Sequence, residues 1–124
     1  MRIVYCIPAT SNSGGMERVL ARKVNYLTEL GHELIVITTD QRGASPFFPL
    51  NEAVQQYDLG INYDETNGKG ILAKLLSYPT KHRQHKQRLS TLLKELHADI
   101  VISMFGDDAT LLPKMKDGSR KVLE

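Results

Sequence analysis

Short apolar runs alternate with longer amphipathic segments along the chain, and each kind of run predicts a different element. Three runs, at residues 2–7, 33–39 and 99–104, contain little polar interruption. Such runs are typical of strands that are buried on both faces of a parallel sheet. A weaker strand pattern covers residues 53–59, and residues 121–124 have the pattern of a further strand at its beginning.

Two segments space their apolar residues three and four apart, as one face of a helix requires. The first predicts a helix from residue 16 to residue 30, and Gly31 follows where a left-handed helix cap favours glycine. The second covers residues 71–96 and contains Pro79, which is predicted to kink or divide the helix. A short helix is also predicted for residues 108–115.

The order of these elements predicts an α/β protein with an open, doubly wound and mostly parallel sheet, which is a Rossmann-like fold. The strand–helix–strand units are expected to cross over in the right-handed sense. The 124 residues suffice for one domain, residues 1–124, with its own core. The last strand would lack neighbours, so we expect the chain to be a fragment of a longer protein. An unpaired strand edge would also allow two copies to associate.

Composition and charge limit the classes of function. Apolar residues make up 41% of the chain and charged residues 24%, which is ordinary for a globular protein. The formal net charge is only +2, and the densest basic run, at residues 81–88, lacks interleaved aromatic residues. No nucleic-acid partner is therefore predicted. The single cysteine, Cys6, excludes an intramolecular disulfide, and no apolar run predicts a signal peptide or a membrane span. These features predict a cytoplasmic protein.

A double glycine, Gly14 and Gly15, joins the first predicted strand to the first predicted helix. In a doubly wound sheet this loop lies at the carboxyl ends of the strands, where ligands bind. Two interpretations are open: the glycines let a phosphate approach the helix N-terminus, or they only permit a tight turn. Neither the G-x-G-x-x-G pattern of dinucleotide-binding folds nor the Gly-Lys-Ser/Thr ending of a P-loop is present.

Four segments of the chain resemble the N-terminal domain of family 4 retaining glycosyltransferases, which have the two-domain GT-B fold. They are Met-Arg-Ile-Val-Tyr at 1–5, Ser-Gly-Gly-Met-Glu-Arg-Val at 13–19, Leu-Gly-His-Glu-Leu-Ile-Val at 30–36 and Ala-Asp-Ile-Val-Ile-Ser at 98–103. The resemblance implies an enzyme that moves a sugar from a nucleotide-sugar donor to a glycan or lipid-linked acceptor with retention of configuration. It implies no cofactor. Because the family's main donor contacts belong to a C-terminal domain that these residues do not include, it also implies that this chain alone is inactive.

The resemblance assigns roles to individual residues as well. Gly14 and Gly15 would face the donor's phosphates, and Ser13 would lie on the acceptor side of the same loop. Asp107 and Asp108 follow a buried strand, where a carboxylate is placed to bind acceptor hydroxyls; the alternative is that one of them caps the next helix. Many family members have a histidine in that loop and this chain has none, so no catalytic residue is assigned.

The second predicted helix carries the densest run of basic side chains. They are Lys81, Arg83, Lys86 and Arg88. The run is either a solvated helix face or a surface that binds anionic lipid headgroups at the inner face of the membrane, which would suit a lipid-linked acceptor. His82 and His85 lie in the same run, but no third ligand has a recognisable spacing, so no metal site is predicted.

Two hypotheses follow for the function. The first is the acceptor-side half of a glycosyltransferase whose full-length form is the enzyme. The second is a non-catalytic α/β module that binds a phosphorylated ligand at its glycine loop. A second α/β domain with a Glu-x7-Glu motif, following residue 124, would decide for the first.

Overall fold

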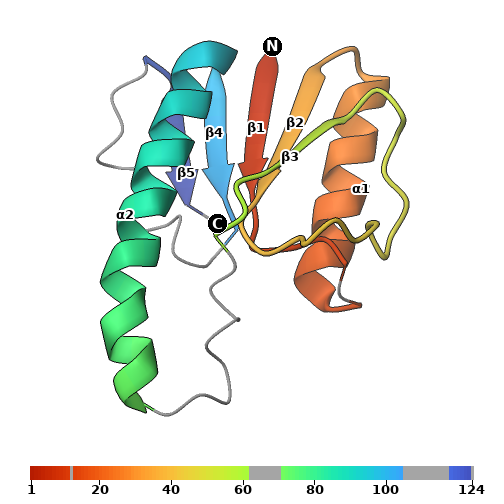
Figure 1. Ribbon diagram of the computed structural model, residues 1–124. Coiled ribbons are helices and arrows are strands. Elements are labelled where there is room, and N and C mark those ends of the chain that lie inside the picture. The colour runs from red at the N-terminus through yellow and green to blue at the C-terminus, as the bar shows by residue number, and fades with distance from the viewer. Residues whose placement is uncertain (12, 62–70, 105–117, 124) are drawn as a thin grey trace.

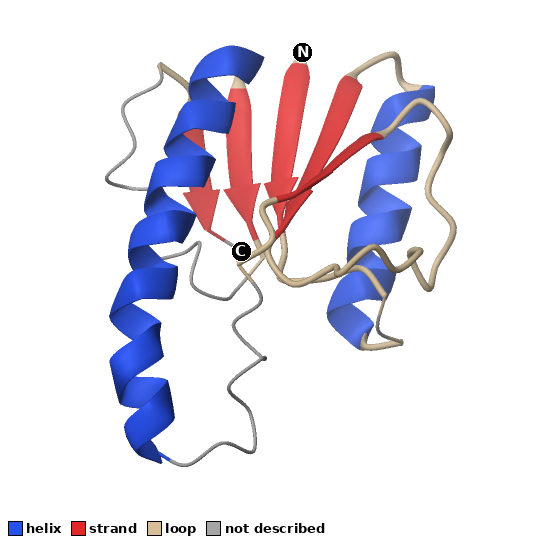
Figure 2. Ribbon diagram, in the orientation of Figure 1, coloured by secondary structure: helices blue, strands red, loops and turns tan. Residues whose placement is uncertain are grey.

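The computed structural model of the chain describes residues 1–11, 13–61, 71–104 and 118–123. They form a five-stranded parallel sheet in the order β3-β2-β1-β4-β5, with helix α1 against one face and helix α2 against the other (Figure 1, Figure 2). The elements in chain order are β1 (Arg2–Cys6), α1 (Gly15–Glu29), β2 (Glu33–Thr38), β3 (Gln55–Asp58), α2 (Ile71–Leu96), β4 (Ile100–Ser103) and β5 (Arg120–Leu123). This is the Rossmann-like α/β fold that the sequence pattern predicted.

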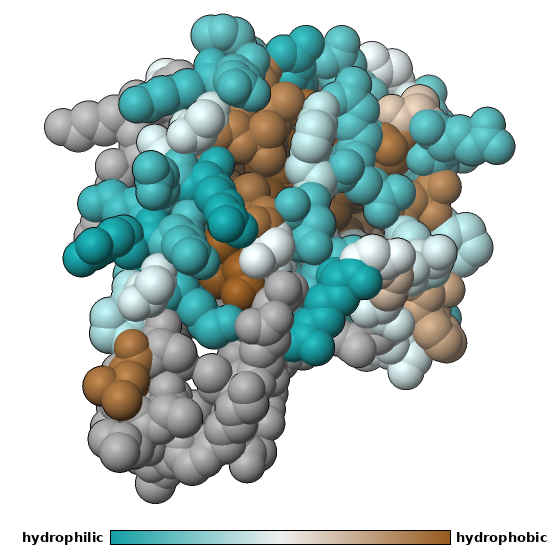
Figure 3. Space-filling model, viewed as in Figure 1, coloured by the Kyte–Doolittle hydropathy of each residue, from teal (hydrophilic) through white to brown (hydrophobic). Residues whose placement is uncertain are grey.

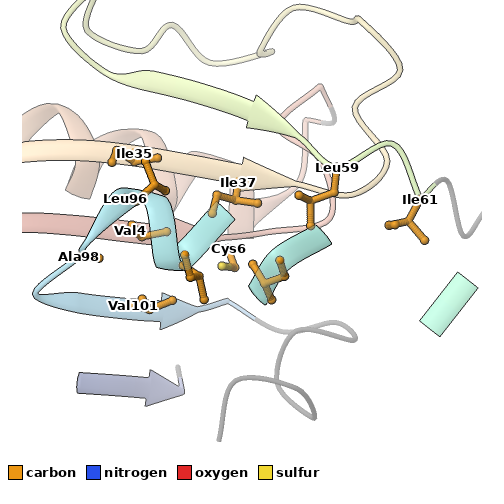
Figure 4. Close-up of a cluster of buried hydrophobic side chains, with 11 residues drawn as sticks. Val4, Cys6, Ile35, Ile37, Leu59, Ile61, Leu96, Ala98 and Val101 are labelled. Atoms are coloured by element: carbon orange, nitrogen blue, oxygen red, sulfur yellow. The ribbon is translucent and has the colours of Figure 1, made fainter. Parts of the chain in front are cut away.

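Strand β1 lies at the centre of the sheet and divides the hydrophobic core in two. Val4 and Cys6 point to the α2 side, where they join apolar side chains of β2, β4 and α2 (Figure 4). Ile3 and Tyr5 point to the α1 side and pack with side chains of β2 and α1. All four are at most 5% exposed. The run of apolar residues in this strand is therefore explained by burial on both faces.

Strand β3 differs from the central strands because it lies at an edge of the sheet. All of its residues are exposed, and it pairs with β2 from Ile35↔Gln55 to Thr38↔Asp58. The flanking residues Val54 and Leu59 are buried, one in each half of the core. The strand predicted at 53–59 is therefore confirmed in its middle, and its apolar ends anchor the edge strand to the core.

Strand β5 forms the opposite edge and confirms the strand predicted to begin at residue 121. It pairs with β4 from Ile100↔Arg120 to Ser103↔Leu123. Association of two copies through an edge strand stays a prediction. The short helix predicted for residues 108–115 lies outside the described residues.

Helix α1 ends in a left-handed glycine, as its sequence predicted. Gly31 has φ +96°, and its N–H donates to the Thr28 carbonyl at 3.0 Å. The N–H of His32 donates to the Leu27 carbonyl at 3.2 Å. This pair of bonds is the Schellman motif, which satisfies carbonyls that would otherwise be left open at the helix end.

Helix α2 runs without a break across Pro79, so the predicted division of this helix is wrong. An interior proline removes one hydrogen bond and strains the turn before it. Pro79 is exposed. Leu89 and Leu93, ten and fourteen residues further along, are fully buried against the sheet and hold the C-terminal part of the helix. The helix therefore tolerates the proline without dividing.

Candidate functional site

The strand order reverses between β1 and β4, and this places the candidate site. The two strands lie side by side, but β1 continues through α1 to β2 on one side, whereas β4 leads to β5 on the other. Their carboxyl ends meet at the same edge of the sheet (Figure 1). Ligands of doubly wound folds bind in the crevice outside such a reversal. Asp107 and Asp108, predicted to bind the acceptor, lie outside the described residues.

The loop after β1 leads the chain into the N-terminus of α1 at this edge. Gly14 is the N-cap residue, with φ −70° and ψ 167°, and its carbonyl accepts the Arg18 N–H at 3.3 Å. Ser13, Gly14 and Gly15 are all exposed. Gly14 carries no side chain that could cap the helix. The N–H groups of the first turn therefore lack a side-chain cap, and the positive end of the helix dipole favours an anion there. Glu17 of the same turn already places one carboxylate beside Gly14.

The backbone of the double glycine does not require glycine. Neither Gly14 nor Gly15 has a positive φ, in contrast to Gly31. A Cβ atom on Gly15 would meet nothing within 4 Å. A Cβ atom on Gly14 would lie 2.6 Å from Oε2 of Glu17, which is the end of a flexible side chain. Neither backbone strain nor lack of space therefore requires glycine at position 15.

A buried glutamine fixes the start of this loop. The Gln41 Oε1 atom accepts the Thr10 N–H at 2.7 Å and the Thr10 hydroxyl at 3.1 Å, while its Nε2 donates to the Ala44 carbonyl at 2.8 Å. The Phe47 N–H donates to the Thr10 carbonyl at 2.8 Å. The loop after β1 is therefore tied to the loop after β2. Sequence reasoning missed Gln41, because a single polar residue in a loop gives no signal of burial.

Strand β4 ends in a buried serine at the same reversal. Ser103 is 1% exposed and stands beside Cys6 in the register of the two strands. Its hydroxyl has no hydrogen-bond partner among the residues that the structure describes. A buried hydroxyl without a partner costs about 1–3 kcal/mol of free energy. Sequence reasoning did not single out this residue, since an isolated serine at a strand end is common.

The structure divides the basic run of α2 into two pairs. Lys81 Nζ donates to the Ile61 carbonyl at 3.1 Å. Arg88 Nη1 donates to the carbonyls of Leu59, at 2.6 Å, and Gly60, at 3.3 Å. These two side chains hold the segment after β3 against the helix.

The other two cations, Arg83 and Lys86, are exposed. Within the described ranges, neither helix has an apolar stretch long enough to cross a bilayer. In the same part of the chain, histidine, cysteine and acidic side chains form no group of three or more that is arranged to hold a metal ion.

Comparisons with protein-family models and with curated protein sequences give no match. Among solved structures, the chain is similar to UDP-galactose 4-epimerase, with 16% sequence identity and a TM-score of 0.42. That similarity covers 84% of this chain and 37% of the epimerase chain. This chain thus corresponds to little more than a third of the epimerase. The Rossmann-like fold rests on the strand order and register described above.

Proposed function

We propose that this chain is the N-terminal, acceptor-side domain of a retaining glycosyltransferase with GT-B architecture. The full-length enzyme transfers a sugar from a nucleotide-sugar donor to a glycan or lipid-linked acceptor. The observation that carries the proposal is the open N-terminus of α1 at the strand reversal, where Gly15 meets no steric or conformational need for glycine. The resemblance of residues 13–19 and 30–36 to family 4 enzymes supports the same assignment.

The geometry suggests how the glycine loop would act on the donor. As the sugar leaves, the bond between its anomeric carbon and the diphosphate oxygen breaks, and negative charge builds on that oxygen. The N–H groups at Gly14 and Gly15 and the helix dipole are preorganised to stabilise this charge. The acceptor oxygen forms the new bond to the anomeric carbon, and its proton passes to the departing diphosphate oxygen. Ser13 and the aspartates Asp107 and Asp108 are proposed to bind the acceptor.

Calorimetric titration of nucleotide sugars tests the proposal. UDP-, GDP- and ADP-glucose are titrated into this chain and into the full-length protein, and transfer to an acceptor is measured in parallel. We expect binding and transfer with the full-length protein only, because the main donor contacts are proposed to lie in its second domain. Tight binding of inorganic phosphate or a sugar phosphate to this chain alone, without transfer by either form, would instead favour a non-catalytic binding module.

The exposed pair Arg83 and Lys86 is proposed to contact anionic lipid headgroups, which would place the protein at the inner face of the membrane. Each basic side chain near such a surface contributes about 1 kcal/mol. We expect the double variant R83Q/K86Q to bind anionic vesicles roughly 10- to 30-fold more weakly than the parent in a sedimentation assay.

The matched control for this experiment is the double variant R18Q/R22Q, which removes two exposed cations of α1 on the other face of the sheet. It is expected to bind the same vesicles nearly as well as the parent. Binding should also weaken with added salt, since salt screens the attraction between exposed charges. An equal loss in both double variants would mean that net charge alone governs binding, and an unchanged R83Q/K86Q would assign the basic run to solvation.

A further inference from the structure

A pocket lies between β3 and α2, away from the glycine loop. Its volume is about 560 Å³, within the range of pockets that bind small molecules. Figure 3 shows an apolar band in this region, flanked by polar side chains over α2 on one side and over β3 on the other. The pocket therefore combines an apolar floor with polar walls.

The wall on the sheet side presents an aromatic ring. Tyr57 pairs with Ile37, whose side chain belongs to the core on the α2 side, so the tyrosine faces α2 as well. The ring is 39% exposed, and its hydroxyl donates to Gln55 Oε1 at 3.1 Å. Leu59 and Leu92, which line the pocket beside it, supply apolar surface. Tyr57 thus offers a partly fixed ring face to a ligand.

The wall on the helix side presents a row of hydrogen-bonding groups. Gln87, Thr91 and Glu95 follow one another at intervals of four, which places them on one face of α2. The side chains of Gln87 and Glu95 make no hydrogen bond or ion pair with any other described residue. Arg88 is held by the Leu59 carbonyl through Nη1, which leaves its remaining N–H groups as oriented donors.

The charges of the pocket balance, which argues against an anionic ligand. Arg88 supplies one guanidinium and Glu95 one carboxylate. The carboxylate of Asp58 points to the other face of β3, because side chains alternate along a strand and Tyr57 faces α2; it accepts hydrogen bonds from the Thr38 hydroxyl and the Gly60 N–H, each at 3.2 Å. A phosphate or a nucleotide would therefore meet no net positive charge. A wholly apolar ligand would desolvate the Glu95 carboxylate and the Gln87 amide without replacing their hydrogen bonds. The pocket instead requires a neutral molecule with both donors and acceptors and an apolar face.

We propose that this pocket binds a neutral saccharide unit. Sugar hydroxyls both donate and accept, as Glu95, Gln87 and Arg88 require, and the C–H face of a sugar ring suits the exposed ring of Tyr57. β3 is two strands from β1, a separation of about 10 Å. A glycan acceptor of several units would bridge that separation. The link to an acceptor rests on the proposed function, whereas saccharide binding itself does not.

A titration followed by amide chemical shifts tests the proposal. Maltotriose, cellotriose, chitotriose and mannotriose are added separately to the isotope-labelled protein. We expect at least one of them to shift the amides of residues 57–59 and 87–95 in a saturable manner. Y57A should raise the dissociation constant about tenfold, because losing one aromatic contact changes an affinity by about that factor. E95Q should also weaken it, and this surface variant leaves β3 unchanged.

Two matched variants separate this pocket from the glycine loop. Y26A removes an exposed tyrosine of α1 on the other face of the sheet and should leave the titration unchanged. G15V should also leave it unchanged, although it is expected to lower sugar transfer by the full-length enzyme. No shift at the pocket with any trisaccharide, or equal weakening by Y57A and Y26A, would overturn the proposal. Shifts confined to residues 13–15 would overturn it while keeping the glycosyltransferase assignment. Saccharide binding at the pocket, with neither donor binding nor transfer by the full-length protein, would keep the pocket and overturn that assignment.

Discussion

Replacing Gly15 with valine is expected to lower sugar transfer by the full-length enzyme by at least about 100-fold, which is the scale of losing preorganised N–H donors to a developing anion. The variant should still fold. A Cβ atom at this position meets nothing within 4 Å, and φ lies outside the left-handed region. The branched side chain would instead occupy the space over the helix N-terminus where the donor's phosphates are proposed to bind.

Transfer rates and thermal unfolding of the same preparations check this expectation. The melting temperature of G15V should stay within about 3 °C of the parent, since valine forms helix no worse than glycine. G15A is the control with a smaller side chain. Its free energy of unfolding should be equal to that of the parent or higher by about 0.4–1 kcal/mol, and it should retain more transfer than G15V. Parental transfer rates in G15V would show that no ligand needs the bare backbone.

Truncating Leu93 to alanine is expected to lower the free energy of unfolding by about 3 kcal/mol. This side chain is fully buried in the half of the core that α2 shares with β1, β2 and β4. Its removal leaves a cavity in a closely packed region, so both the transfer free energy and the lost contacts contribute.

Urea unfolding of L93A beside L76A measures this difference. Leu76 lies on the same helix, but it is 72% exposed, and its truncation should change the free energy of unfolding by no more than about 0.5 kcal/mol. Both variants change the same residue type within one helix, so helix propensity cancels in the comparison. Equal destabilisation by the two changes would mean that α2 does not dock on the sheet through the face described.

The local patterns predicted most of the fold, and the reason is burial. A central parallel strand such as β1 is covered on both faces, so successive residues must be apolar and the strand is visible as an uninterrupted apolar run. The left-handed cap at Gly31 was predicted for a similar reason, because a positive φ at a helix end has few alternatives to glycine. Features that depend on one segment alone are visible in that segment.

Features that depend on distant segments were missed or predicted wrongly. The local rule for proline predicted a kink or a division at Pro79, and α2 is not divided there. The pocket beside Tyr57 and Glu95 joins residues 38 positions apart in the sequence (95 minus 57), and no spacing rule connects them. The buried hydrogen bonds of Gln41 also arise only when the loops after β1 and β2 meet.

The candidate site was predicted in part. The position of Gly14 and Gly15 followed from the order of strand and helix, but only the structure shows that their backbone conformation is an ordinary one. The choice between the two interpretations of the double glycine stays with the G15V experiment. The predicted roles of Asp107 and Asp108 concern residues outside those described, and they stay predictions.

The buried Gln41 has a consequence for the motions of the site. Its side chain bonds to Thr10 in the loop after β1 and to Ala44 in the loop after β2. The Phe47 N–H donates to the Thr10 carbonyl and joins the same two loops. Opening either loop breaks bonds in both, so the two should fluctuate together and exchange their amide hydrogens as one cooperative unit. A ligand that orders the glycine loop would then also restrain the segment of Phe47, an exposed aromatic residue, through the bonds that Thr10 makes to Phe47 and to Gln41.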